Sequence, residues 1–203
     1  MKHRAATFLT VAVAVSSIWA AIPKENRTSD RFGYSTFLED AGRVTILADG
    51  YPASVAPKSG YVPVPVAVAV TQPGRRVVFR PESFTLVDAD GHAVPAASFE
   101  EITTKYGRRN HDRSLARLRP IAVPETIGAL LQVPSAFYPP VNGGTRIPEV
   151  ELSSGTWFQD ILYFPVPPSG LHGVLTLRVT IQGEPTVDVR FVATEKELSG
   201  ANG

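Results

Sequence analysis

Two carboxylates and one imidazole alternate along a short stretch of the chain, at Asp88, Asp90 and His92. In a strand, side chains two residues apart lie on one face, and oxygen and nitrogen ligands of this kind can hold a divalent cation. The same stretch also suits a tight turn, because Asp tolerates turn geometry and Gly91 supplies a positive φ. No Glu follows at the spacing of a calcium-binding loop. The pattern favours the turn, and the metal site is the alternative.

A second group of reactive side chains is a basic run between positions 105 and 119, where six Lys or Arg residues accompany a single acid, Asp112. The candidate residues for binding an anion or an acidic partner are Lys105, Arg108, Arg109, Arg113 and Arg117. Guanidinium groups bind phosphate, sulfate and carboxylate, which makes the run a candidate binding surface. The alternative is a solvated surface, partly neutralised by Glu100 and Glu101 just upstream.

Catalytic groups are sparse in this sequence. The chain has four histidines and no cysteine, which excludes disulfides, thiol catalysis and cysteine-bound metals. It contains no Gly-x-Ser-x-Gly elbow, no His-Glu-x-x-His helix and no phosphate-binding loop. We therefore expect a protein that is not an enzyme and that needs no cofactor.

The elements that would position these residues are mostly strands. The clearest is 61–71, where valine occupies every second position. Pro63 and Pro65 cannot donate ladder hydrogen bonds, which predicts that the first half of this strand lies at a sheet edge or a bulge. Turn residues separate the other apolar runs. The remaining predicted strands are 43–47, 84–87, 92–95, 150–152, 157–164, 174–181 and 187–192, the last two forming a hairpin.

Aromatic residues gather in the 157–164 strand. Its alternation places Phe158 and Phe164 on one face, which we expect to be core. Trp157 and Tyr163 share the opposite face, which we expect to lie beneath another part of the chain. The alternative is an aromatic groove for a carbohydrate or a peptide.

Residues of about 100–147 interrupt the strand pattern. Loops longer than about 15 residues usually carry a function or a structure of their own. A short helix is predicted at 112–118, and Pro124 followed by Glu125 is typical of a helix start. We therefore expect a long, partly helical insertion on a β-domain.

The order of the strand motifs resembles a known kind of domain. Phe-Thr-Leu-Val-Asp-Ala-Asp-Gly at 84–91 follows the Val-rich strand, and Tyr-Phe-Pro-Val-Pro at 163–167 precedes a Leu-rich one. This order resembles small exported bacterial immunoglobulin-like domains of unknown function, over residues 42–100 and 148–193. The resemblance implies an all-β fold, an antiparallel immunoglobulin-like β-sandwich of about seven strands, and no particular reaction. The expected domain spans 42–194, followed by a polar tail at 195–203.

The first residues have the layout of an export signal. A basic start precedes 17 uncharged residues rich in Ala and Val, and a charged segment follows. A cleaved signal at 1–21 is favoured, an uncleaved membrane anchor is the alternative, and residues 22–41 are expected to be a linker. The protein is then periplasmic, at the cell surface or extracellular. Without residues 1–21 the net charge changes from +1 to −1, which gives no global attraction to nucleic acid.

Together these observations predict an exported, non-catalytic protein interaction or envelope assembly module that works through the insertion at 100–147. Its partner would be another envelope or surface protein and not a nucleic acid. Contact with a membrane would involve only the N-terminal segment, if that segment stays uncleaved. The alternative is a periplasmic protein that binds a small ligand or a divalent metal.

Overall fold

Strands are the commonest regular elements of the structure, as the alternating apolar sequence predicts. The computed structural model describes residues 27–28, 35–40, 44–55, 60–182 and 186–193. The described residues form twelve strands, ten of which have three residues or more, together with four short α-helices and one 3-10 turn, η1 (Pro81–Ser83). The expected export segment, 1–21, and the tail, 195–203, lie outside the described residues.

The first five-stranded sheet contains the predicted hairpin near the C-terminus. Its order is β1 (Arg27–Thr28), β12 (Val187–Val192), β11 (Val174–Val179), β6 (Phe84–Val87) and β7 (Ala93–Pro95). All neighbours are antiparallel except the two-residue strand β1, which runs parallel to β12. The hairpin register pairs Val174 with Val192 and Val179 with Val187, which confirms the predicted pairing.

The second five-stranded sheet holds the Val-rich strand at its centre. Its order is β2 (Ser35–Asp40), β3 (Val44–Asp49), β4 (Tyr61–Val70), β10 (Thr156–Pro165) and β8 (Leu131–Gln132). Strand β2 pairs antiparallel with β3 along its whole length. The expectation of a linker throughout 22–41 is therefore wrong for 35–40, because backbone pairing with an apolar neighbour orders this polar segment.

The two prolines of β4 lie where the sheet can tolerate them. Strand β4 pairs with β10 from Tyr61 to Val70, but with β3 only from Val66 to Val70. Pro63 and Pro65 therefore lie in the half that has a described neighbour on one side only. The lost N–H donors leave no gap in a ladder, and the predicted edge position is confirmed.

A short third sheet joins β5 (Arg76–Phe79) to β9 (Val150–Ser153) in antiparallel pairing. Arg76 in β5 forms an ion pair with Glu151 in β9, at 3.1 Å. Strand β5 was not predicted from the sequence, nor were β1, β2 and β8. The expected number of about seven strands is therefore wrong. Strands β1 and β8 have two residues each, β5 has four, and β2 lies in a segment with several polar residues, so none of them shows a long apolar alternation.

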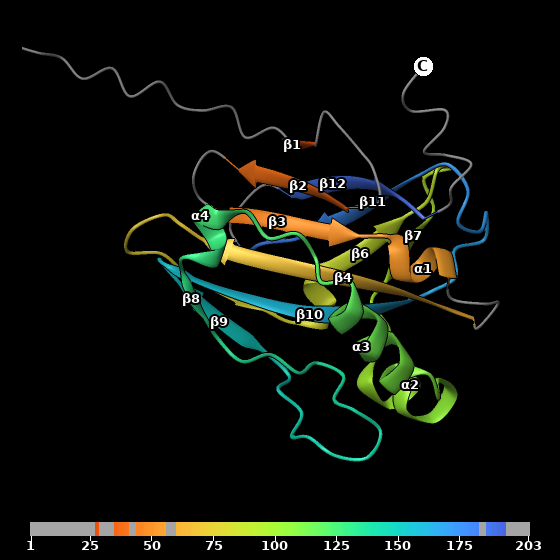
Figure 1. Ribbon diagram of the computed structural model, residues 1–203. Coiled ribbons are helices and arrows are strands. Elements are labelled where there is room, and N and C mark those ends of the chain that lie inside the picture. Colours follow the sequence, from red (N-terminus) through yellow and green to blue (C-terminus); the bar gives the residue numbers. More distant parts are fainter. Residues whose placement is uncertain (1–26, 29–34, 41–43, 56–59, 183–185, 194–203) are drawn as a thin grey trace, which may run out of the picture.

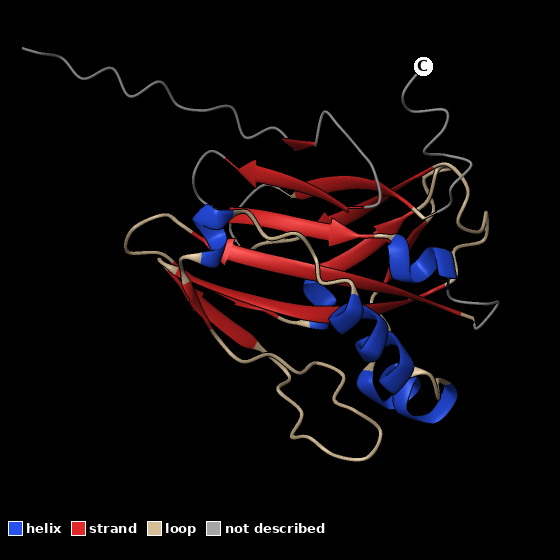
Figure 2. Ribbon diagram, in the orientation of Figure 1, coloured by secondary structure: helices blue, strands red, loops and turns tan. Residues whose placement is uncertain are grey.

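One hydrophobic core joins the two large sheets. It contains Val68 and Phe158 from one sheet and Leu86, Leu177 and Phe191 from the other, all fully buried. The strands stack in layers, and the helices lie outside them (Figure 2). Phe158 confirms the predicted core face of β10. At Gly50 the layers approach so closely that a Cβ would lie 2.2 Å from the Val192 carbonyl oxygen, which leaves no room for a side chain.

The insertion is partly helical, as predicted. Its helices are α2 (Phe99–Lys105), α3 (Arg109–Leu118) and α4 (Glu125–Gly128), while α1 (Tyr51–Val55) follows β3. The Ser98 side chain accepts a hydrogen bond from Glu101 N at 3.1 Å and so caps α2. Helices α2 and α3 lie together at one end of the strands (Figure 1). None of the helices in the described part of the chain has the length and apolar character of a membrane-spanning helix.

Candidate functional site

Two of the candidate arginines are anchors and not surface charges. Arg109 and Arg113 lie one turn apart on α3, so both reach the same neighbouring segment. Arg109 is 3% exposed and donates from Nη1 to the Pro139 carbonyl at 3.0 Å. Arg113 donates from Nη2 to the Tyr138 carbonyl at 2.6 Å. Guanidinium groups expected to bind an external anion thus each commit one nitrogen to the backbone of the insertion.

Arg113 also neutralises a buried acid. Its Nη2 lies 3.6 Å from Asp160 Oδ1, and the Asp160 side chain is 1% exposed. Asp160 accepts two further hydrogen bonds, from Phe137 N and Ile161 N, both at 2.8 Å. Burial raises the pKa of Asp160, and these N–H groups and the charge of Arg113 offset the effect only in part. Asp160 therefore ties strand β10 to the segment that α3 also holds.

The segment held by these contacts leads into an exposed loop, residues 139–145, which we call the 139–145 loop. Its base is closed by the hydrogen bond from Ile147 N to Ala136 O at 2.9 Å. On its first arm, Val141 N donates to Asn110 Oδ1 on α3 at 3.0 Å. The Val141 side chain is 47% exposed. The loop extends beyond the strands, beside the ends of α2 and α3 (Figure 1).

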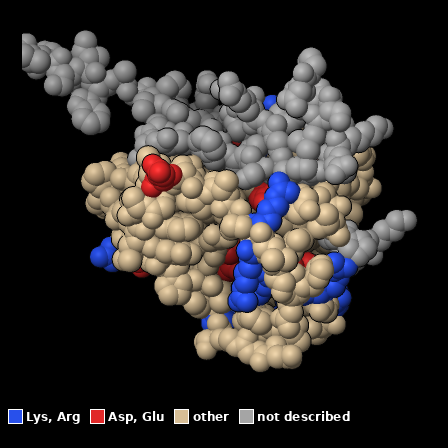
Figure 3. Space-filling model, viewed as in Figure 1, with Lys and Arg blue, Asp and Glu red and all other residues tan. Residues whose placement is uncertain are grey.

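Glycines shape the tip of the 139–145 loop. Gly144 has a φ of +108°, and a Cβ there would lie 3.2 Å from Pro140 Cδ and 3.3 Å from Pro139 Cβ. Only glycine therefore combines this backbone conformation with packing against the prolines. The loop contains no charged residue. In Figure 3, Lys and Arg gather around α3, whereas the lowest part of the molecule is uncharged.

Beneath α2 and α3 lies a buried tyrosine cluster. Tyr106 donates to Asp112 Oδ2 at 2.7 Å, and Tyr138 donates to Ala97 O at 2.5 Å. The rings of Tyr106 and Tyr138 pack against the ring of Tyr163 at centroid distances of 5.1 and 5.2 Å. Burial raises the pKa of Asp112, and the hydrogen bond from Tyr106 opposes this. Tyr163 thus lies beneath the insertion, as predicted.

Trp157, on the same face of β10 as Tyr163, also lies under the insertion. It packs in a second cluster with Ile121 and Ile127, which come from the segments before and within α4. Its Nε1 donates to Leu130 O at 3.2 Å. The aromatic side chains of β10 therefore fix the insertion to the sheet, which confirms the expectation of packing over that of an open aromatic groove.

The remaining basic candidates are scattered around the anchors. Lys105 is exposed and lies 3.5 Å from Glu101, which also accepts a 2.7 Å hydrogen bond from Tyr61. Arg108 is half-buried at the start of α3. Arg117 is exposed, and it makes no hydrogen bond or ion pair with any described residue. The structure thus divides the predicted basic surface into buried anchors and separate exposed charges.

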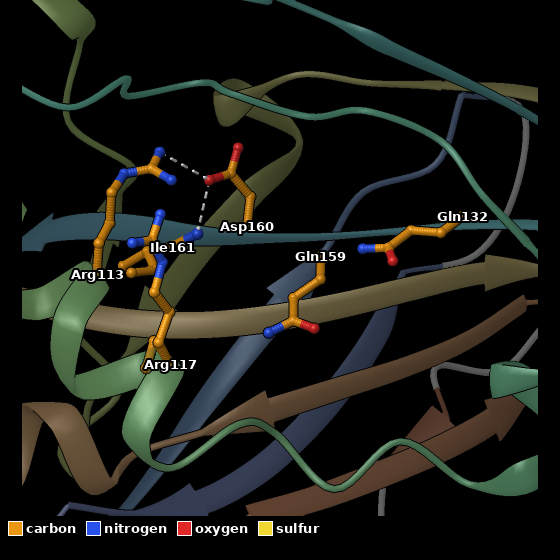
Figure 4. Close-up of a pocket in the computed structure, with 7 residues that line it drawn as sticks. Arg113, Arg117, Gln132, Gln159, Asp160 and Ile161 are labelled. Carbon is orange, nitrogen blue, oxygen red and sulfur yellow. Dashed lines mark hydrogen bonds and ion pairs between the residues drawn. The ribbon is translucent and has the colours of Figure 1, made fainter. Parts of the chain in front are cut away.

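Arg117 borders a hollow that we call the α3 groove. Its volume is about 250 Å³, and it is lined by Arg113, Ala116, Arg117, Gln132, Gln159, Asp160 and Ile161. Arg113 and Arg117 extend from α3 towards Asp160, and the two glutamines lie further along (Figure 4). An adjoining hollow of about 330 Å³ shares both glutamines and reaches Ser135. Asp160 was not among the predicted site residues, although an acid within a mainly apolar strand is a visible signal.

The residues considered as a metal site form a turn. Asp88 Oδ1 accepts hydrogen bonds from Asp90 N at 3.0 Å and His92 N at 2.7 Å. Its other oxygen accepts from Ser169 Oγ and lies 3.0 Å from His92 Nδ1. Burial alone would raise the pKa of Asp88, but the hydrogen bonds from Ser169 and His92 outweigh it and hold the pKa well below its usual range. Gly91 has the expected positive φ, 88°.

This geometry leaves few ligand atoms that could bind a cation. Asp90 and His92 are exposed, and Asp88 has committed both oxygens to the turn. Within the described ranges, no group of three or more His, Asp or Glu side chains is placed to share a metal ion.

Comparisons with known proteins add one distant likeness. No family model matches the chain, and no curated protein matches it. Among solved structures, the chain is similar to the crystal structure of the YjhA protein from Bacillus subtilis, with a TM-score of 0.41 and 10% sequence identity. The match covers 79% of this chain and 99% of the YjhA chain. At this degree of similarity the comparison assigns neither a family nor a function.

Proposed function

We propose that this protein is an exported, non-catalytic β-sandwich of immunoglobulin-like type that binds another envelope or surface protein through the 139–145 loop. One observation carries the proposal. Arg109, which is buried, and Arg113, which is half-buried, donate to the carbonyls of Pro139 and Tyr138, while the tip of the loop stays exposed. The chain thus uses a buried and a half-buried guanidinium to hold a loop whose tip, 141–145, lies outside the core.

A loop held in this way suits recognition. Ordering a flexible segment on binding costs free energy, and a loop already fixed on a scaffold avoids most of that cost. The exposed tip offers the apolar side chain of Val141, the amide of Asn142 and the hydroxyl of Thr145, without charge. These groups fit the neutral, hydrogen-bonding surface of a folded protein better than a polyanion.

Two further parts of the proposal rest on sequence. The motifs at 84–91 and 163–167 support the immunoglobulin-like type, and the apolar segment in 1–21 supports export. N-terminal sequencing of the protein recovered from its native cell envelope tests export. A mature chain that begins after Ala20 or Ala21 supports it, and an intact N-terminus on a cytosolic protein contradicts it.

Site-specific photo-crosslinking tests the binding role of the loop. A photoreactive residue replaces Val141 in one variant and Val166 in a matched control, since Val166 is similarly exposed, at 40% against 47%, but lies outside the insertion. Both variants are expressed in the native cells, irradiated and analysed by mass spectrometry. We expect one defined protein adduct from position 141 and none of that mass from position 166. Equal patterns from both positions would refute the proposal.

A further inference from the structure

The α3 groove carries an excess of positive charge that nothing in the described structure neutralises. Two guanidinium groups, from Arg113 and Arg117, face one carboxylate, that of Asp160. Asp160 is already bound by two backbone N–H groups and by Arg113. Arg117 pairs with no described residue. One net positive charge therefore remains at the groove, which matches one negative charge on a ligand.

The donors available there have the geometry for a carboxylate. A guanidinium presents parallel N–H groups that match the two oxygens of a carboxylate. In Arg113, only Nη2 contacts Tyr138 O and Asp160, and Nη1 has no described partner. A phosphate monoester carries nearly two negative charges at neutral pH and would exceed the single positive excess. The charge balance thus favours a monoanion.

The far part of the groove suits hydroxyl groups. Gln132 and Gln159 line both this hollow and the adjoining one. A side-chain amide both donates and accepts hydrogen bonds, as a sugar hydroxyl does. The volume of about 250 Å³ lies below the usual range of pockets for drug-sized ligands, which begins at about 300 Å³. The adjoining 330 Å³ leaves room for groups that extend past the glutamines.

From these observations we propose that the α3 groove binds a small hydroxylated monocarboxylate of the size of a single sugar acid, with Arg117 and Arg113 on the carboxylate and the two glutamines on the hydroxyls. This site is separate from the proposed protein-binding loop, because no residue of 139–145 lines the groove. Either proposal can therefore fail without the other.

Calorimetric titration of the full chain with D-glucuronate tests the inference, with D-glucose and inorganic phosphate as comparison ligands. We expect glucuronate to bind at least about tenfold more tightly than either comparison ligand. Arg117→Ala should weaken glucuronate binding by about tenfold or more, because it removes a guanidinium that is proposed to bind the carboxylate. The fold should be unaffected, because Arg117 is exposed and makes no hydrogen bond or ion pair with a described residue. Lys105→Ala removes an exposed cation on α2, outside the groove, and should leave binding unchanged.

Arg117→Lys extends the test, because it keeps the charge and loses the planar pair of donors. Binding weakened in Arg117→Lys, though less than in Arg117→Ala, would support recognition of a carboxylate by the guanidinium. Three results would overturn the inference: equal binding of glucuronate and glucose, tighter binding of phosphate, or unchanged glucuronate binding in Arg117→Ala.

Discussion

Replacing Arg113 by Met perturbs the site where a buried charge matters most. Met keeps an unbranched, flexible stem but removes the guanidinium. The change breaks the 2.6 Å hydrogen bond to Tyr138 O and the 3.6 Å ion pair with Asp160. Because the Asp160 side chain is 1% exposed, water in the adjoining α3 groove compensates its carboxylate less well than the lost cation did.

We expect Arg113→Met to lower the free energy of unfolding by about 3 kcal/mol at neutral pH. Removing one partner of a buried ion pair costs about 3–5 kcal/mol. We expect a cost at the lower end of this range for the Arg113–Asp160 pair, because the Arg113 side chain is 23% exposed. In addition, Asp160 keeps the hydrogen bonds from Phe137 N and Ile161 N.

Arg109→Met is the matched variant, one turn earlier on the same helix. Arg109 donates to Pro139 O and forms no ion pair with a described residue, so we expect a loss of about 2 kcal/mol. The pH dependence separates the two variants. Burial holds the pKa of Asp160 above its ordinary value, and losing Arg113 raises it further. As pH falls from neutral, Asp160 takes up a proton, the unpaired charge disappears and the deficit of Arg113→Met shrinks.

Urea unfolding followed by far-ultraviolet circular dichroism, at a series of pH values, measures both deficits. The deficit of Arg109→Met should stay constant as pH falls, while that of Arg113→Met approaches it. If the loss of unfolding free energy in Arg113→Met does not change with pH, Arg113 does not stabilise the ionised carboxylate of Asp160. Equal deficits for both variants at neutral pH would refute the same reasoning.

Three further predictions, one of them with a control substitution, test other parts of the structure. Gly50→Ala places a Cβ 2.2 Å from a backbone oxygen of β12 and should cost about 3 kcal/mol in urea unfolding, whereas Gly128→Ala, with no atom within 4 Å, should cost nothing. Asp88→Asn should lower the melting temperature at neutral pH. Burial would raise the pKa of Asp88 in the folded state, but hydrogen bonds, chiefly from Ser169, lower it below its ordinary value. The difference in melting temperature should therefore disappear as pH falls below the ordinary pKa of a carboxyl group. Ser98→Ala removes the cap of α2 and should cost about 1 kcal/mol by chemical denaturation.

The strands that the sequence predicted are those with a long or clear alternation. Valine at every second position of β4 predicted a strand. The two prolines predicted which half of it lies at the sheet edge. The Asp88 turn was equally predictable, since its residue types have few other uses. Strand β5 alternates exposed and buried residues, but its adjacent Val77 and Val78 hide this alternation in the residue types.

The roles of the arginines could not be read from the sequence. A basic run is usually solvated, and nothing local shows that Arg109 and Arg113 face backbone carbonyls about 25 to 30 residues away. Leu118 shows the reverse error. As an apolar residue of the predicted helix it would be expected in the core, yet it is 85% exposed, and the buried residues of α3 are Arg109 and Asp112. Which residues of α3 are buried depends on tertiary contacts, and helix propensity and hydrophobic periodicity do not predict those contacts.

The most direct test of the central claim combines the crosslinking probe at Val141 with Arg109→Met. The claim is that the buried arginines of α3 hold the 139–145 loop in the form that a protein partner binds. We predict a defined adduct from position 141 in the otherwise native protein. In the Arg109→Met background, at equal amounts of folded protein, the yield of that adduct should fall several-fold. An undiminished adduct would contradict the claim, because it would show that the partner binds the loop whether or not α3 holds it.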